Sequence, residues 1–206
     1  MLNHTLPAPT DFGAPLPLAP SSAVLDYLAT RRSTPAHTLN APGPDAETLA
    51  AILRLGARVP DHGKLTPWRF VTFTPESKAR LVEALMPLAA HQADPVKASK
   101  ALSKLSNPPV SVLVISAPVQ PHPIPEWEQA LSAACVCHNM LLAGGAFGFG
   151  VNWITDWYSY DPAATGLYGL KDGEKVAGFI HFGTAPSAPL ERERPDVAAL
   201  ITEWDG

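Results

Sequence analysis

The chain has 206 residues, 46% of them hydrophobic, and a formal net charge of −4 at pH 7. This length and apolar content suit one sizeable core, and the charge, with no run of Lys and Arg, excludes a general affinity for nucleic acids or anionic membranes. Because the 17% charged fraction is low for a soluble monomer, we expect a homodimer that buries part of the apolar surface.

Residues 1–21 are rich in Pro and Ala. Proline disfavours both helix and ladder hydrogen bonds, so this composition predicts an extended arm. The segment lacks the basic and apolar regions of a signal peptide, and no apolar stretch of the chain has the length of a membrane span, so we expect a cytoplasmic protein. Residues 22–206 show no further change of composition and are predicted to form one domain.

The first half of this domain is predicted to contain three helices and one strand. A serine pair provides a cap for a helix over residues 23–30, and Asp45 provides one for a helix over residues 45–57. Residues 68–74 alternate aromatic and β-branched side chains as a strand does, and residues 77–90 return to helical spacing. The predicted order is therefore helix, helix, strand, helix.

The second half is predicted to supply most of the sheet. Residues 110–117 are a β-branched run bounded by prolines, which indicates a central strand covered on both faces. Residues 126–144 are apolar nearly all round and predict a long helix buried between layers or between subunits. Residues 151–155 and 176–183 complete the strands. The mixed order with few strands indicates an α+β fold.

Arg31, Arg32 and Ser33 follow the first predicted helix. A phosphate monoester suits this combination, because Arg supplies forked donors and Ser adds a directed hydrogen bond. A solvated basic helix end, favoured by the helix dipole, is the alternative interpretation. Taken alone, the three residues fit either a phosphate site or an ordinary helix terminus.

A loop crowded with hydrogen-bond donors precedes the first predicted strand. It contains Arg58, His62 and Lys64, of which the last two lie between Pro60 and Pro67. Loops of this kind tend to be held rigid, and rigid donors suit a ligand rich in carbonyls and ring nitrogens. Taken in isolation, His62 equally fits a side chain satisfied by local backbone groups, and Trp68 fits a core aromatic.

Residues 144–155 are dense in glycine and end in Trp153, Ile154 and Thr155. Glycines allow close backbone approach to a flat ligand. The spacing is reminiscent of dinucleotide loops, but the segment follows a helix and precedes a strand, which is the wrong context for a Rossmann phosphate turn. A Rossmann site is therefore excluded.

Five motifs in this order resemble the YdjA-like branch of the nitroreductase superfamily. They are Arg31-Arg32-Ser33, Pro60-Asp61-His62 leading to Pro67-Trp68-Arg69-Phe70, Trp127-Glu128-Gln129, Gly148-Phe149-Gly150 with Trp153 beyond it, and Gly183-Thr184-Ala185-Pro186. The match runs from about residue 24 to the C-terminus. The resemblance implies an α+β fold with a central, mostly antiparallel sheet flanked by helices, and an intertwined homodimer with FMN at the interface.

By position, the resemblance also implies roles for individual residues. The residues that would bind FMN are Arg31, Arg32, Ser33, Arg58, His62, Trp153, Ile154, Thr155, Arg192 and Arg194. The face shared by flavin and nicotinamide would be Ala146, Phe147, Gly148, Phe149, Gly150 and Val151. Many relatives carry Lys or Arg two residues beyond the motif serine, where this chain has Pro35. We hypothesise that Arg58 supplies the missing positive charge.

The activity implied by the resemblance is hydride transfer from NAD(P)H through the flavin N5 to a flat acceptor such as a nitroaromatic or a quinone, with ping-pong kinetics. No catalytic acid or nucleophile is needed from the protein, since the flavin carries the chemistry. Two alternatives are another flavin reaction on the same fold and a non-enzymatic FMN carrier or sensor. We expect no metal, because of Cys135, Cys137 and His138 only the first and last share a helix face.

Overall fold

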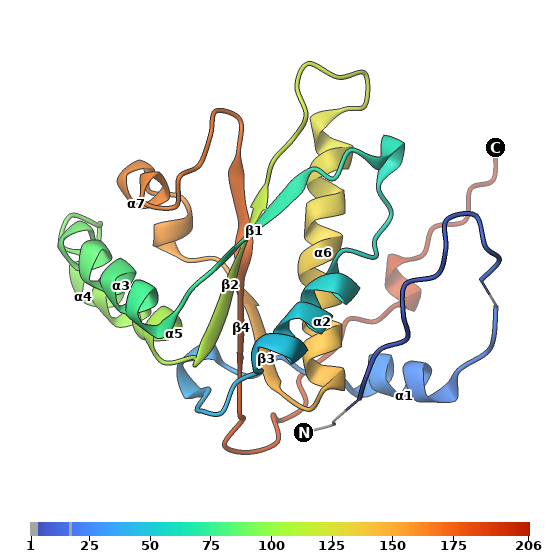
Figure 1. Cartoon of the computed structure of the whole chain (residues 1–206), viewed down its shortest axis with the longest axis horizontal. Helices are drawn as coiled ribbons and strands as arrows, with labels where there is room; N and C mark the ends of the chain where they lie inside the picture. The colour runs from blue at the N-terminus through green and yellow to red at the C-terminus, as the bar shows by residue number, and fades with distance from the viewer. Residues whose placement is uncertain (1–3, 17) are drawn as a thin grey trace.

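The computed structural model describes residues 4–16 and 18–206 (Figure 1). The parts of the predicted arm at residues 1–3 and 17 lie outside the described residues. The helices are α1 (Ser22–Thr30), α2 (Ala46–Gly56), α3 (Pro75–Ala89), α4 (Pro95–Ala101), α5 (Ser103–Ser106), α6 (Glu126–Ala146) and α7 (Pro162–Gly166). The strands are β1 (Trp68–Thr72), β2 (Val110–Ser116), β3 (Gly150–Ile154) and β4 (Lys175–Gly183).

The four strands form one sheet in the order β1-β2-β4-β3, and all three neighbouring pairs are antiparallel. The predicted α+β fold with a central antiparallel sheet is therefore confirmed. Strand β2 is an inner strand, as the sequence indicated, with β1 and β4 on either side. Its residues alternate between the two faces: Val112 and Val114 belong to one core cluster, and Leu113 and Ile115 to the other.

Helices cover both faces of the sheet (Figure 1). One core lies between the sheet and α2 with α6, and it includes Ile52 and Met140. The other core lies between the sheet and α3, α5 and α7, and it includes Leu85 and Phe179. The sheet is thus the middle layer, and α6 is the longest element packed against it.

The ends of several elements differ from the sequence prediction for local reasons. Strand β1 stops at Thr72 because Thr74 serves as the cap of α3, its hydroxyl accepting a hydrogen bond from the backbone N–H of Ser77 at 3.1 Å. Helices α4, α5 and α7 were not predicted, because each is shorter than two full turns and offers little periodicity.

Helix α6 continues two residues beyond its predicted end, to Ala146, and the chain turns away from the helix at Gly148. The backbone N–H of Phe149 bonds the carbonyl of Gly144 at 3.1 Å, and that of Gly148 bonds Gly145 at 2.9 Å. With Gly148 at a φ of +91°, these two bonds form a Schellman motif, in which a residue without a Cβ is strongly preferred.

The described part of the N-terminal arm contains no helix or strand before α1, and its first residues lie along α2. Leu6 packs against the core that contains α2, and Arg54 donates a hydrogen bond to the carbonyl of Pro7 at 3.0 Å. Further on, the ammonium group of Lys64 lies 5.9 Å from the ring centroid of Phe12. The residues after β4, 184–206, are here called the C-terminal segment. In Figure 1 this arm, α1 and the C-terminal segment all lie on the α6 side of the sheet.

No helix among residues 4–16 and 18–206 combines the length and the apolar character that crossing a membrane requires.

Candidate functional site

Arg31, Arg32 and Ser33, here called the basic cluster, stand where α1 ends against the C-terminal half of α6. The hydroxyl of Tyr27 donates to the carbonyl of Leu142 at 2.9 Å and so docks α1 on α6. The guanidinium of Arg31 then donates to the hydroxyl of Ser33 at 3.1 Å. All three side chains of the cluster are half-buried, so their donors are oriented by the protein and still reach solvent.

The segment after the basic cluster is fastened to the outer edge of β3. The backbone N–H of Thr34 donates to the carbonyl of Val151 at 3.0 Å, and the side-chain amide of Asn152 donates to the carbonyl of Thr34 at 2.6 Å. These two bonds hold Ser33 beside the start of β3. The structure therefore brings the basic cluster close to the strand that carries Trp153 and Ile154 and that Thr155 follows.

The C-terminal segment also reaches the basic cluster. Arg32 donates to the carbonyl of Leu190 at 2.9 Å, and its guanidinium lies 3.9 Å from the carboxylate of Glu191. The same carboxylate pairs with Arg194 at 2.8 Å. A hydrogen bond from the backbone N–H of Arg192, together with Arg194, holds the pKa of Glu191 below its ordinary value. Glu191 thus links the two C-terminal arginines to Arg32.

Arg58 and His62 occupy a separate loop, residues 58–62, here called the His62 loop. Three polar side chains on one stripe of α6 hold it. Glu128 accepts a hydrogen bond from His62 at 2.8 Å, Ser132 donates to the carbonyl of Pro60 at 2.6 Å, and Asn139 donates to the carbonyl of Arg58 at 2.8 Å. Four and seven residues separate the three positions, which places them on the same helix face.

The basic cluster and the His62 loop stand at opposite ends of α6. Tyr27, just before the cluster, bonds Leu142, whereas His62 bonds Glu128. Fourteen residues of helix at about 1.5 Å per residue separate these contacts by about 21 Å along the axis. A single protomer therefore does not bring the two sets of predicted residues together.

The side chains that follow on β3 are already partly engaged. The indole of Trp153 donates to the carbonyl of Ala177 at 3.1 Å and packs against the α6-side core. Thr155 accepts a hydrogen bond from the hydroxyl of Tyr160 at 2.7 Å, and Ile154 is half-buried. These residues can therefore offer a ligand mainly their backbone groups and their apolar surface, beside the basic cluster.

The glycine-dense segment serves mainly to pack the end of α6. A side chain at Gly144 would meet Phe182 and Val151, and one at Gly145 would meet Tyr27. A side chain at Gly150 would meet Leu39. At these three glycines, side chains of the protein therefore occupy the space in which the sequence suggested that a flat ligand approaches the backbone.

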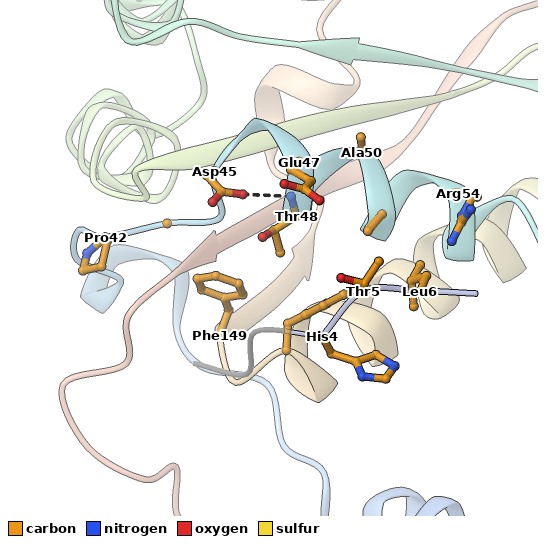
Figure 2. A pocket seen from close by; sticks show the side chains of 13 residues that line it. His4, Thr5, Leu6, Pro42, Asp45, Glu47, Thr48, Ala50, Arg54 and Phe149 are labelled. Carbon is orange, nitrogen blue, oxygen red and sulfur yellow. Dashed lines mark hydrogen bonds between the residues drawn. The ribbon is translucent and has the colours of Figure 1, made fainter. Parts of the chain in front are cut away.

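A cavity of about 830 Å³ lies between the N-terminal arm, α2 and the turn after α6. Figure 2 shows His4 and Thr5 of the arm facing α2 across it, with Phe149 at its side. Phe147 also lines the cavity, whereas Ala146 and Gly148 are exposed beside it. The carboxylate of Asp45 is used as the cap of α2, bonding the backbone N–H of Thr48 at 2.8 Å. The described lining contains neither the basic cluster nor the His62 loop.

A buried polar line crosses the sheet toward the basic cluster. Ser111 on β2, His181 on β4 and Asn152 on β3 are in register, and Ser111 Oγ lies 2.9 Å from His181 Nδ1. Asn152 Oδ1 and His181 Nε2 are buried without a hydrogen-bond partner among the described residues. Lys78, buried at the far end of this line, donates to the carbonyl of Pro108. A polar line of this kind fixes the strand register next to Thr34.

Sequence reasoning assigned no role to Glu128, Ser132, Asn139 or Asn152. The spacing of the first three on one face of a predicted helix was a usable signal, because polar residues on an otherwise apolar helix need partners. The partner of Asn152, by contrast, is a backbone carbonyl 118 positions away in the chain, which periodicity does not reveal.

Comparison with known proteins gives a matching family model and relatives that align over most of the chain. The model of the Nitroreductase family matches residues 28–184. YdjA of Escherichia coli strain K12, an NAD(P)H nitroreductase by name, is 34% identical over 180 residues, which cover 86% of this chain and 97% of that protein. An NAD(P)H nitroreductase by name from Haemophilus influenzae is 34% identical over 164 residues, covering 78% of this chain and 87% of that protein.

Solved structures share the fold at lower identity. A nitroreductase-like family protein from Bacillus cereus superposes with a TM-score of 0.78 at 21% identity, covering 92% of this chain and all of that one (100%). A nitroreductase with bound FMN from Bacteroides fragilis superposes with a TM-score of 0.67 at 24% identity, covering 90% of this chain and 100% of that one.

Proposed function

Because the chain belongs to the nitroreductase family, we propose that it is an FMN-dependent oxidoreductase that passes reducing equivalents from NAD(P)H to a flat acceptor such as a nitroaromatic or a quinone. The observation that carries this proposal is the basic cluster, in which the Arg31 guanidinium and the Ser33 hydroxyl are already hydrogen-bonded to each other and half-buried at the edge of β3. The proposed catalytic domain spans residues 22–206, preceded by the arm.

The residues of the basic cluster fit the phosphate group of FMN. Arg31 and Arg32 offer forked donors and Ser33 a hydroxyl, and the two C-terminal arginines are held nearby through Glu191. FMN supplies the capacity to accept and then give up a hydride when it is bound. The backbone of residues 153–155 lies beside the cluster and would support the ring system. Since the flavin carries the chemistry, no acid or base is required there.

A homodimer completes the proposed site. Since the basic cluster and the His62 loop are about 21 Å apart along α6, one cofactor that uses both is best served by two copies with their α6 helices antiparallel. In that arrangement the His62 loop of one protomer meets the basic cluster of the other. Arg58, which we propose replaces the charge missing at Pro35, would then act from the partner subunit.

The distribution of exposed apolar side chains supports this dimer. Many of them lie on α1, on α6 and in the C-terminal segment, on the α6 side of the sheet (Figure 1). They include Val24, Leu25, Leu28, Trp127, Leu131, Leu200, Ile201 and Trp204. Exposed apolar surface on this scale is typical of an interface rather than of a free surface.

The proposal predicts ping-pong kinetics, because the nicotinamide and the acceptor would use the same space in turn. An absorbance spectrum of the purified protein, followed by anaerobic addition of NADH and then NADPH, tests it. We expect flavin bands that bleach on addition of at least one donor. Flavin bands that persist with both donors would favour a carrier, and a protein that does not take up FMN would overturn the proposal.

A further inference from the structure

We propose that Glu128 is a positioning residue for His62. It holds the imidazole in one orientation and in the tautomer with the proton on Nδ1, so that Nε2 is presented to the flavin. The inference rests on the proposed function, in which His62 is a flavin contact. It concerns a residue that touches neither cofactor nor substrate and acts only through His62.

The geometry of the pair sets the pattern of protons. His62 Nδ1 and Glu128 Oε2 are 2.8 Å apart. A carboxylate only accepts hydrogen bonds, so Nδ1 carries the proton and donates it. In the neutral imidazole the other nitrogen, Nε2, is then a free acceptor. No group in residues 4–16 or 18–206 forms a hydrogen bond with Nε2.

Side chains of α6 already hold the backbone of the His62 loop. Rotation of the His62 side chain is then the main motion left to restrict. Ser132 and Asn139 bond the carbonyls of Pro60 and Arg58, on the two sides of Val59. Inside the loop region, the Asp61 carboxylate accepts hydrogen bonds from the backbone N–H groups of Leu65 and Thr66 at 3.1 and 2.9 Å. With the backbone held, the hydrogen bond that His62 donates to Glu128 restricts rotation of the imidazole. Without this bond, ordering the imidazole on binding would cost entropy and weaken ligand binding.

A purely structural role for this pair is testable because the chain contains a matched control. Glu126 and Glu128 both lie in the first turn of α6, and both side chains are 47% exposed. Each is in one ion pair, Glu126 with Lys175 at 3.0 Å and Glu128 with His62. Exposed pairs of this kind contribute little to stability, and removing either acid changes the charge near the helix terminus in the same way.

The experiment measures FMN affinity by quenching of flavin fluorescence in Glu128→Ala, Glu128→Gln, Glu126→Ala, His62→Ala and the double variant Glu128→Ala/His62→Ala. We expect Glu128→Ala to weaken FMN binding about fivefold, and Glu128→Gln, which keeps an acceptor for Nδ1–H, to recover most of the affinity. Glu126→Ala is expected to bind as the wild type does. In the His62→Ala background, the further loss of Glu128 is expected to have no effect on affinity.

A second measurement does not depend on the flavin. Nitrogen-15 spectra of the histidine rings in FMN-free protein report which ring nitrogen carries the proton. We expect the Nδ1–H form for His62 in the wild type and in Glu126→Ala, and a shift toward the Nε2–H form in Glu128→Ala.

The outcomes separate the two proposals. Equal FMN affinity in Glu128→Ala and the wild type, alongside a loss in His62→Ala, would overturn the role of Glu128 and leave the flavoprotein standing. An equal loss from Glu128→Ala with and without His62 would also overturn it, because Glu128 would then act by another route. A wild type that binds no FMN would overturn the proposed function and this inference with it.

Discussion

Ser111 and His181 face each other across β2 and β4 in the middle of the sheet, with Ser111 Oγ 2.9 Å from His181 Nδ1 and both side chains buried. Burial, with the nearby positive charge of Lys78, lowers the pKa of His181 to about 3. The imidazole is therefore neutral in the folded protein over the whole physiological range.

This pair predicts acid sensitivity. In the unfolded chain a histidine takes up a proton near pH 6.5, whereas folded His181 does so only near pH 3. The stability contributed by neutral His181 is thus fully present above pH 6.5 and is lost as the pH falls toward 3, by about 1.4 kcal/mol per pH unit. Urea unfolding of FMN-free protein at pH 7.5 and 5.5 should show a fall of about 1.4 kcal/mol. The double variant Ser111→Ala/His181→Phe should lack this part of the fall, and an unchanged fall would contradict the assignment.

Gly148, just beyond the end of α6, is expected to be sensitive to substitution because of its backbone conformation. Its positive φ in the Schellman motif is strained for any residue with a Cβ, so Gly148→Ala should lower the free energy of unfolding by about 1 kcal/mol. Gly166→Ala is the control, because Gly166 ends α7 without a positive φ and has open space where a Cβ would lie. Chemical denaturation of both variants tests this. Equal stability in the two variants would be inconsistent with a strained position at Gly148.

The ion pairs Arg69–Glu174 and Lys175–Glu126 should differ in their contribution to the free energy of unfolding. Arg69 forms two parallel hydrogen bonds to Glu174, at 2.8 and 2.7 Å, and the Glu174 side chain is only 7% exposed. The bonds from Arg69 lower the pKa of Glu174 to about 2. We expect Arg69→Gln to cost about 2 kcal/mol of unfolding free energy. Lys175→Gln, which breaks an exposed pair, should cost less than about 0.5 kcal/mol in the same denaturation experiment.

Arg31 is expected to recognise the phosphate of the cofactor rather than its ring. Arg31→Ala should therefore weaken the binding of FMN about tenfold or more, and that of riboflavin much less, since riboflavin has no phosphate. Fluorescence titration with both flavins measures this. A parallel loss for FMN and riboflavin would place Arg31 against the ring system and contradict the proposed phosphate site.

Mixed dimers test whether each site uses two chains. A dimer of one Arg31→Ala protomer and one His62→Ala protomer has one site with both substitutions and one site with neither, if the sites form across the interface. Random reassembly of equal amounts of the two variants, at an FMN concentration too low to fill sites with a substitution, should then restore about a quarter of the wild-type sites. If both residues of a site belong to one protomer, every site carries one substitution and mixing restores no activity.

The sequence predicted the main elements because their signals are local. Asp45 was recognisable as a cap, and its carboxylate does bond the backbone of Thr48. The run at residues 110–117 was recognisable as an inner strand because both of its faces are apolar, and β2 occupies that place. Capping and alternation depend on a few neighbouring residues, which explains why these predictions were accurate.

What the sequence did not reveal depends on contacts between distant residues. The separation of His62 from Arg31 along α6 follows from the docking of Tyr27 near one end and of the His62 loop at the other. The packing role of Gly144 and Gly145 likewise depends on Phe182 and Tyr27, which come from β4 and α1. Motif order assigns such residues to one site, but it carries no information on which chain of a dimer provides each of them.

The attachment of Thr34 to β3 has a consequence for self-association. A strand at the edge of a sheet exposes unpaired backbone groups that invite pairing with another molecule. On β3 the outward carbonyl of Val151 is already bonded by Thr34, whose own carbonyl is bonded by Asn152. At the opposite edge, β1 is only five residues long and carries the charged side chain of Arg69. Both edges of this sheet are therefore poor templates for the strand-by-strand growth that leads to aggregates.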